Sequence, residues 1–206
     1  MFSDIETDVK REEQKRQTRA RILEAARDLF EQHGFDDASI RAIAEEASVA
    51  AGTVMLHFED KRDLLHSALF ADLEDALEQT LETIPDTQLE EQLNHVTEGM
   101  FAYYEQRPTL SRVLLRESLF AEDPWASRFT EQVGRVHARL AELFNDAIER
   151  GELAADCDTV RLGAAYFSFY YFALISWVQG AHPDPVGMVG RLVKQHLRGV
   201  TGEDNE

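Results

Sequence analysis

The chain has 206 residues, of which 44% are hydrophobic and 29% charged, and its formal net charge is −18. This composition excludes a disordered chain, and the length suffices for one domain or two small ones with a substantial core. The single cysteine, Cys157, excludes a disulfide framework and cysteine-rich zinc sites, and the polar, charged start excludes a secretory signal peptide, so we expect a cytoplasmic protein.

No segment alternates apolar and polar residues as a strand does, so the expected class is all-α, with about nine helices. Residues 1–16 are expected to form a mobile basic arm, and residues 17–33 a first helix that stops at Gly34. The segment 10–21 carries six basic residues against Glu12 and Glu13. Alone, this run indicates a solvated helix end; beside the motif that follows, it favours contact with DNA phosphates.

Residues 39–61 predict a helix-turn-helix. Ile40, Ile43, Ala44 and Ala47 share one face of a first short helix, for which Ser39 is a favoured N-cap. We expect a positive φ at the turn residue Ser48. The second helix then turns Val54 towards the core, an arrangement that places a helix in the DNA major groove.

The stretches TRARILEAARDLFEQHGF, ASIRAIAEEASV and GTVMLHFEDKRDLL together resemble the DNA-binding domain of the TetR family of regulators, over residues 18–65. The turn residue, usually Gly, is Ser48, the frequent Ser-Lys opening of the second helix is Ala50-Ala51, and its common aromatic is Met55. These departures favour methyl contacts and DNA-shape readout over hydrogen bonds to bases.

The resemblance implies a homodimeric, ligand-responsive repressor that binds a pseudo-palindromic operator in double-stranded DNA. It divides the chain into the arm (1–16), the helix-turn-helix domain (17–60) and a helical domain for effector binding and dimerisation (61–206). Lys61 would meet a phosphate at the start of the fourth helix, although an ordinary surface lysine is the alternative. The expected DNA contacts are Arg19, Ser39, Ala50, Ala51, Gly52, Thr53, Met55, His57 and Lys61.

Caps and prolines delimit the later helices. Asp60 is expected to cap a helix that ends near residue 83, and Thr87 with Glu90 to form a capping box for the next helix, which ends near residue 106. Further helices are expected at residues 109–120, from Asp123-Pro124 to residue 149, at 158–179, and from Asp184-Pro185 to near Gly199.

Residues 162–178 contain no charge, so the eighth helix should be buried on all sides. A membrane span is the rival, but the stretch is short, contains serines and tyrosines, and has no second span. We expect no membrane partner. One face should pack on its own domain, while the other meets the ninth helix and a second copy, giving a dimer through the eighth and ninth helices.

Aromatic residues on the fifth to eighth helices suggest a cavity for a small apolar or amphipathic effector, although plain core or dimer interface is the alternative for each. If Arg112 and Arg116 faced it, an anionic amphiphile such as an acyl thioester or an aromatic acid would fit. The candidates are Phe101, Tyr104, Arg112, Arg116, Phe120, Trp125, Phe129, Tyr166, Phe169, Tyr170 and Trp177.

The sequence contains no pattern typical of a catalytic site. The histidines form no metal-binding doublet, Cys157 has no adjacent base, and there is no phosphate-binding glycine loop, so neither metal, cofactor nor catalytic residue is expected. Two other classes stay open: an all-α enzyme, and a helical interaction module that has lost specific DNA binding. The excess of 39 acidic over 21 basic residues, only four of them lysine, suggests a high-salt cytoplasm.

Overall fold

The computed structural model describes residues 2–198, with side chains from residue 7 onward. Residues 1 and 199–206, including the first residue of the expected arm and the expected helix end near Gly199, lie outside this range. Within it the chain is all-α, as predicted, and forms no strand. Its helices are α1 (Phe2–Asp37), α2 (Ile40–Glu46), α3 (Ala51–His57), α4 (Lys61–Glu82), α5 (Leu89–Gln106), α6 (Pro108–Leu119), α7 (Trp125–Glu149), α8 (Thr159–Val178) and α9 (Pro185–Arg198).

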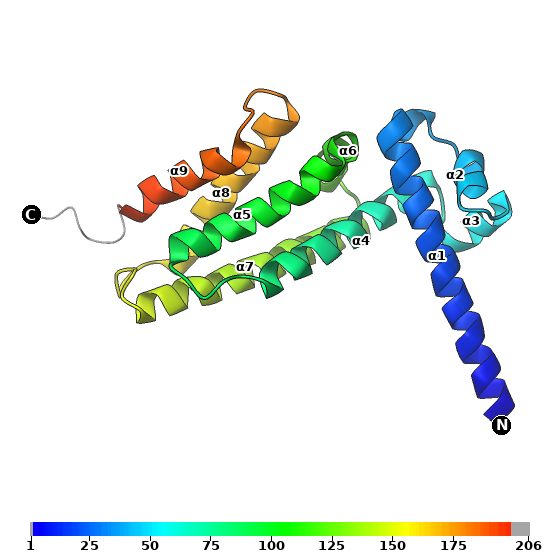
Figure 1. Ribbon diagram of the computed structural model, residues 1–206, viewed down its shortest axis with the longest axis horizontal. Helices are drawn as coiled ribbons and strands as arrows, with labels where there is room; N and C mark the ends of the chain where they lie inside the picture. The colour runs from blue at the N-terminus through cyan, green and yellow to red at the C-terminus, as the bar shows by residue number, and fades with distance from the viewer. Residues whose placement is uncertain (1, 199–206) are drawn as a thin grey trace, which may run out of the picture.

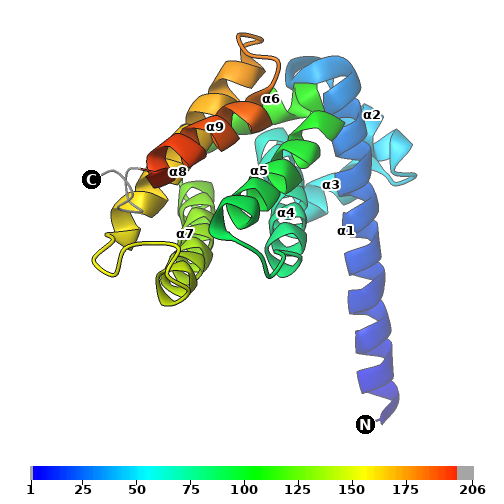
Figure 2. The same cartoon turned by 60° about the vertical axis from the view of Figure 1, so that its left-hand side comes forward.

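The helices form a small group and a larger bundle (Figure 1). Helices α2 and α3 lie beside α1 at one end, and α4 runs from them into the bundle of α5 to α9. In the turned view, α8 and α9 lie side by side, and α9 also packs on α5 (Figure 2). Helix α1 touches the bundle through α4 and α6, so these contacts connect the two parts.

The helix-turn-helix forms as its sequence predicts. The Ser39 side chain accepts a hydrogen bond of 3.1 Å from the Ala42 N–H and caps α2. Ser48 has a φ of 54°, the left-handed conformation that the tight turn requires. Val54 is fully buried, which fixes the face of α3 that packs on α2. The remaining faces of α3 are therefore turned outwards.

Helix α1 begins at Phe2 and not at residue 17, so the prediction of its start is wrong. Glu13 pairs with Arg16 at 2.8 Å and accepts a hydrogen bond from Gln17 at 2.7 Å, and such pairs three and four residues apart stabilise a solvated helix. No Gly or Pro interrupts the segment before Gly34, whose φ of 78° breaks the helical geometry as expected. The additional turns project away from the body (Figure 1). Mobility of this segment stays a prediction.

The N-cap predicted from the local sequence is confirmed for α4 and wrong for α5. The Asp60 carboxylate accepts a hydrogen bond of 2.8 Å from the Asp63 N–H. At α5 the predicted capping box of Thr87 and Glu90 is wrong, because the cap residue is Gln88 and makes no side-chain bond. The Leu89 N–H instead donates to the Glu152 carboxylate at 2.7 Å, a partner 63 residues away.

The start of α7 also differs slightly from the prediction. Pro124 is the cap residue rather than the first helical residue, so α7 begins at Trp125. Asp123 still stabilises the start of α7, because its carboxylate accepts a hydrogen bond from the Ser127 N–H at 3.2 Å.

Helix α8 is buried along one side only. Tyr166, Tyr170 and Ala173 are buried, whereas the Phe172 side chain is 59% exposed. The complete burial expected of this helix therefore does not occur within one chain. Across residues 2–198, none of the helices combines the length and apolarity that crossing a bilayer requires.

Candidate nucleic-acid interface and ligand cavity

Helix α3 presents most of its side chains to solvent. Val54 and the following Phe58 are buried, while Met55 is 47% and Leu56 is 85% exposed. Thr53 and His57 are half-buried, and Ala50, Ala51 and Gly52 are exposed. The predicted contacts on this segment are thus accessible to a duplex. Leu56 is not among the predicted contacts, although its position two residues after the core-facing Val54 places it off the buried face of a short helix.

Basic side chains of α1 lie beside the C-terminal end of α3. The Arg19 guanidinium stacks 5.0 Å from the centre of the Phe58 ring. The pKa of His57 is lowered from its usual value, first by burial and then by the positive charges of Arg19 and Lys15. Arg19 and the predicted contact His57 therefore belong to one neighbourhood, where a phosphate would reduce like-charge repulsion.

Lys61 is not a free surface lysine. Its ammonium donates to the backbone carbonyls of Asp36 at 3.1 Å and Ala38 at 2.9 Å, and lies 4.5 Å from the centre of the Phe35 ring. These contacts tie the start of α4 to the connection between α1 and α2. An ammonium has three N–H donors, so one remains for a phosphate. Ser39 lies beside this connection, with its hydroxyl oxygen engaged in the α2 cap.

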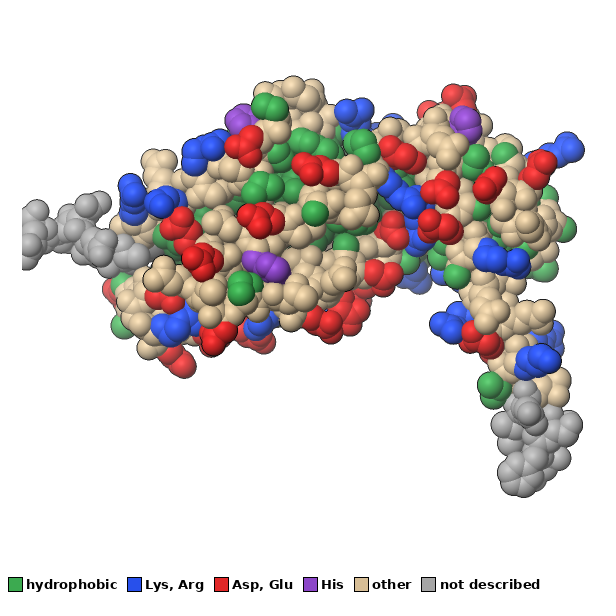
Figure 3. Space-filling view, viewed as in Figure 1, with side chains coloured by type: hydrophobic (Ala, Val, Ile, Leu, Met, Phe, Trp, Pro, Cys, Tyr) green, Lys and Arg blue, Asp and Glu red, His purple; other side chains and the backbone are tan. Residues whose placement is uncertain are grey.

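The projecting part of α1 carries exposed Lys10, Arg11 and Lys15. In the space-filling view, Lys and Arg side chains gather on this part with few acidic neighbours, whereas acidic side chains are spread over the bundle (Figure 3). The −18 net charge of the chain is thus unevenly distributed, with a local basic segment next to α3.

A cavity of about 540 Å³ lies among α4, α5, α6, α7 and α8. Of the predicted ligand contacts, Tyr104, Phe129, Tyr166 and Tyr170 line it. Most of its wall was not predicted, because it consists of aliphatic and small polar residues, which a search for aromatic residues does not find. These include Leu73, Leu77, Val96, Met100, Ser111, Leu114, Leu115, Ser118, Gln132, Val133, Val136 and Leu174. Two aromatic residues of the wall, Phe167 and Tyr171, were not predicted either.

Two predicted contacts lie on the outer face of α6, and a third, Phe120, directly follows its last residue. Arg112 is exposed, the Arg116 side chain is 60% exposed, and Phe120 is 82% exposed. The two arginines are four residues apart and share one side of the helix, opposite the buried Leu110 and Leu114. Their placement in the cavity wall is therefore wrong, and the condition for an anionic ligand, two arginines facing the cavity, is not met.

The other four predicted contacts are packing residues behind the wall or elsewhere in the bundle. Trp125 lies edge-on to His66 at 5.5 Å and beside Phe129. Phe101 is buried between Tyr170 and Trp177, at 5.5 and 6.3 Å between ring centres. The remaining one, Phe169, contacts the ring of His196 in α9.

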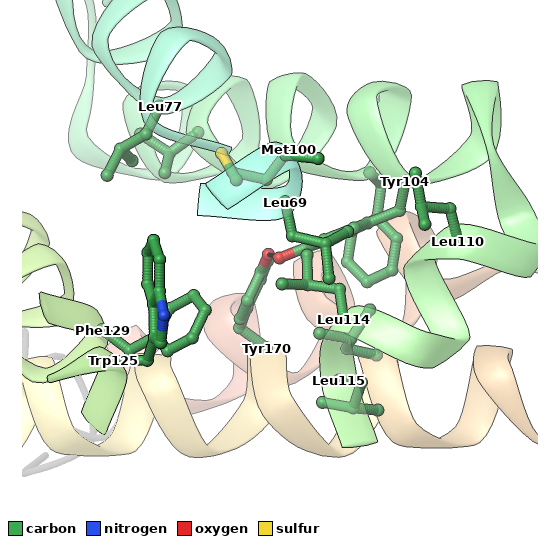
Figure 4. Close-up of a cluster of buried hydrophobic side chains, with 14 of the residues drawn as sticks. Leu69, Leu77, Met100, Tyr104, Leu110, Leu114, Leu115, Trp125, Phe129 and Tyr170 are labelled. Atoms are coloured by element: carbon green, nitrogen blue, oxygen red, sulfur yellow. Dashed lines mark hydrogen bonds between the residues drawn. The ribbon is translucent and has the colours of Figure 1, made fainter. Parts of the chain in front are cut away.

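Two tyrosine hydroxyls in the cavity wall are hydrogen-bonded to each other. The Tyr170 hydroxyl donates to the Tyr104 hydroxyl at 2.8 Å (Figure 4). Burial raises the pKa of Tyr104 to about 12, so this hydroxyl is protonated at neutral pH. Tyr166 is satisfied internally: its hydroxyl donates to the Leu93 carbonyl at 3.2 Å and shares a hydrogen bond with Thr97.

Ion pairs join α1 to the elements around the cavity. Arg107, at the junction of α5 and α6, pairs with Asp28 at 3.0 Å and Glu24 at 3.1 Å. Arg27 pairs with Asp72 of α4 at 2.9 Å. The two arginines therefore link α1 with α4 and with the start of α6.

The described residues contain no group of three or more His, Cys, Asp or Glu side chains placed to hold a metal ion.

Comparison with known proteins places these features in context. A family model described as "Bacterial regulatory proteins, tetR family" matches residues 22–68. The HTH-type transcriptional repressor KstR of Mycolicibacterium smegmatis is 30% identical over 146 residues, which cover 70% of this chain and 69% of that protein. The HTH-type transcriptional regulator UidR of Escherichia coli K12 is 26% identical over 161 residues, covering 76% of this chain and 80% of its own.

The fold is also similar to that of the transcriptional regulator FadR from Bacillus subtilis, solved in complex with stearoyl-CoA. The TM-score is 0.73 at 21% identity, with 88% of this chain and 98% of that chain covered. At this identity the likeness concerns the fold.

Proposed function

The chain belongs to the TetR family of DNA-binding transcriptional regulators, and we propose that it is a dimeric repressor whose operator affinity falls when a small molecule enters the cavity. The observation that carries this proposal is the outward face of α3, where Met55 and Leu56 are exposed and where Arg19 and Lys15 of α1 lie near His57. Exposed apolar side chains on a short helix suit thymine methyl groups in the major groove, and the neighbouring cations suit phosphates. Such a protein would act in the cytoplasm, where the chromosome lies.

DNA contact would divide between α3 and its neighbours. Thr53, Met55 and His57, with Ala50, Ala51 and Gly52 at the helix start, would approach base edges and the sugar backbone. Arg19, Ser39 and Lys61 would contact phosphates around this helix, Lys61 through its remaining N–H. The domain division proposed for the chain follows from this: residues 17–60 for DNA, with the arm before them, and residues 61–206 for effector and dimer.

Dimerisation would use α8 and α9. Phe172, in the second half of α8, is 59% exposed on a helix that is rich in apolar residues. A second copy related by a two-fold axis would cover this face and present two copies of α3 to successive major grooves, about 34 Å apart along B-DNA. This spacing is the reason for expecting a pseudo-palindromic operator.

A ligand in the cavity would act on DNA binding through α4 and α6. Ser111, Leu114 and Leu115 of α6 line the cavity, and the start of α6 is tied to α1 by Arg107. A ligand that displaces α6 would move α1, and through α4 the position of α3. If the ligand binds the displaced state more tightly, it shifts the population away from the spacing that fits DNA.

The experiment is a selection of bound DNA fragments with the purified protein, followed by titration of the enriched sequence at several salt concentrations. We expect a palindromic site whose affinity falls steeply with salt and is lost in Thr53→Ala. Thr83→Ala is the matched control, because Thr83 follows the last residue of α4, at the end of that helix away from α3. This variant should bind DNA like the parent. No enriched sequence at any salt would contradict the proposal and favour an interaction module.

An enzymatic role receives no support from the relatives, which are regulators by name.

A further inference from the structure

The cavity wall carries no charged side chain within the described part of the chain. Leucines, valines, methionine and aromatic rings make up most of it. The polar members are hydroxyls and one amide, all uncharged. Transfer of an ionised group into such surroundings without a partner of opposite charge is strongly unfavourable. The composition of the wall therefore selects against ionised ligands of either sign.

The ionised groups near the wall do not change this. Gln132 donates to the carboxylate of Glu74 at 2.6 Å, and Arg135 forms an ion pair with the same carboxylate. Neither Glu74 nor Arg135 lines the cavity, and the two charges offset each other. The two arginines of α6 point to solvent on the opposite side of that helix. Among residues 7–198, no cation is thus placed to receive a carboxylate or phosphate inside the cavity.

The two tyrosines supply one unused hydrogen-bond donor. In the contact between Tyr170 and Tyr104, one hydroxyl hydrogen is used between them. Two hydroxyls carry two hydrogens, so one remains, whichever residue donates. Both residues are deeply buried and both line the cavity. A ligand oxygen that accepts this hydrogen would complete the pair, whereas an alkane would leave it unsatisfied.

We propose that the cavity binds an uncharged, mainly apolar molecule with one acceptor oxygen, a ketone, ester or alcohol, held by the Tyr104–Tyr170 pair. As the identity of an effector this rests on the regulatory function proposed above; as a ligand class it rests on the cavity alone. It replaces the anionic amphiphile that the sequence suggested, because the arginines required for that ligand face away.

The test measures binding of four ten-carbon probes to the full chain without DNA, by calorimetry at pH 7.5: 2-decanone, 1-decanol, decanoate and decylamine. We expect both neutral probes to bind at least tenfold more tightly than the two ions. Leu114→Trp, which fills the cavity, should abolish binding of all four while keeping the helical content. Decanoate or decylamine binding as tightly as the neutral probes would overturn the proposal, as would no binding of either neutral probe up to its solubility.

Variants of the tyrosine pair test the donor. The double change Tyr104→Phe and Tyr170→Phe removes both hydroxyls and should weaken 2-decanone about five- to tenfold, the value of one hydrogen bond. Tyr103→Phe, at a neighbouring tyrosine outside the cavity wall, should leave the affinity unchanged. Unchanged binding in the double variant would overturn the role of the pair.

Operator affinity measured with and without bound 2-decanone tests the ligand class and the regulatory function separately. If the ketone binds but does not release DNA, the ligand class stands and the ligand-responsive mechanism is contradicted.

Discussion

The carboxylate of Glu31, near the end of α1, accepts a hydrogen bond of 2.7 Å from the backbone N–H of Leu110, in the first turn of α6. Its other oxygen accepts one of 3.1 Å from the Thr109 N–H. The first N–H groups of a helix have no partner within the helix, so α1 supplies the cap that α6 lacks. The helix that forms part of the cavity wall is thereby fixed to the helix that carries the basic segment.

Replacement of this cap should loosen α6. We expect Glu31→Ala to lower the free energy of unfolding by about 1 kcal/mol, the usual value of an N-cap, and to speed hydrogen exchange at the amides of Thr109 and Leu110. Denaturant unfolding and exchange measured by NMR are the two readouts. Glu98→Ala, an exposed glutamate on α5, should change stability by less than about 0.5 kcal/mol. Equal exchange rates in Glu31→Ala and the parent would contradict the capping role.

His57 should make DNA affinity depend on pH. In the free protein its pKa lies below the usual value because of burial, Arg19 and Lys15. A phosphate beside it favours the charged imidazolium and raises the pKa, so binding takes up a proton and affinity should increase as pH falls from 8 to 6. The stability of the free protein should instead decrease as pH falls below about 6.5. The reason is that His57 binds a proton more readily in the unfolded chain than in the folded protein, where its pKa is lowered.

Operator titrations at pH 6, 7 and 8 measure this effect. His57→Gln should remove the increase, while His33→Gln, at an exposed position in the last turns of α1, should keep it. The same pH dependence in His57→Gln and the parent would exclude His57 as the titrating group.

The helix-turn-helix could be predicted because its signals are local. The Ser39 side chain caps α2 by accepting a hydrogen bond from an N–H only three residues away, and the apolar spacing around Ile43 determines which side of α2 is buried. Even the strained turn at Ser48 follows from its position between two such patterns. Together with the family resemblance, these few residues defined the fold class and the function.

The cavity could not be predicted to the same extent, because it depends on how distant helices meet. The α5 cap comes from Glu152, far along the chain, and the sequence has no sign of this contact. The orientation of α6 was partly available, since the spacing of Leu110 and Leu114 already places Arg112 and Arg116 on another face. Aromatic content was a weaker guide than this periodicity.

The projecting part of α1 should contribute phosphate contacts. Changing Lys10 and Lys15 together to Gln should reduce the slope of log affinity against log salt by about 0.9 for each phosphate that the variant no longer neutralises, with little change in the preferred sequence. Arg16→Gln is the matched control, because Arg16 is already paired with Glu13 at 2.8 Å. Salt titrations of the enriched operator provide the measurement. A slope unchanged in the double variant would show that this segment does not touch DNA.

The excess of acidic side chains should make the fold more stable in salt. With a net charge of −18, repulsion between surface carboxylates acts over about 10 Å at 0.1 M salt and about 3 Å at 1 M. The free energy of unfolding should therefore increase between 0.1 and 1 M KCl, measured with urea as denaturant because urea adds no charge. Changing the exposed Glu78, Glu82 and Glu98 to Gln should raise stability at 0.1 M by about 1 kcal/mol and reduce the gain from salt. Equal stability of the parent at both salt concentrations would contradict adaptation to a high-salt cytoplasm.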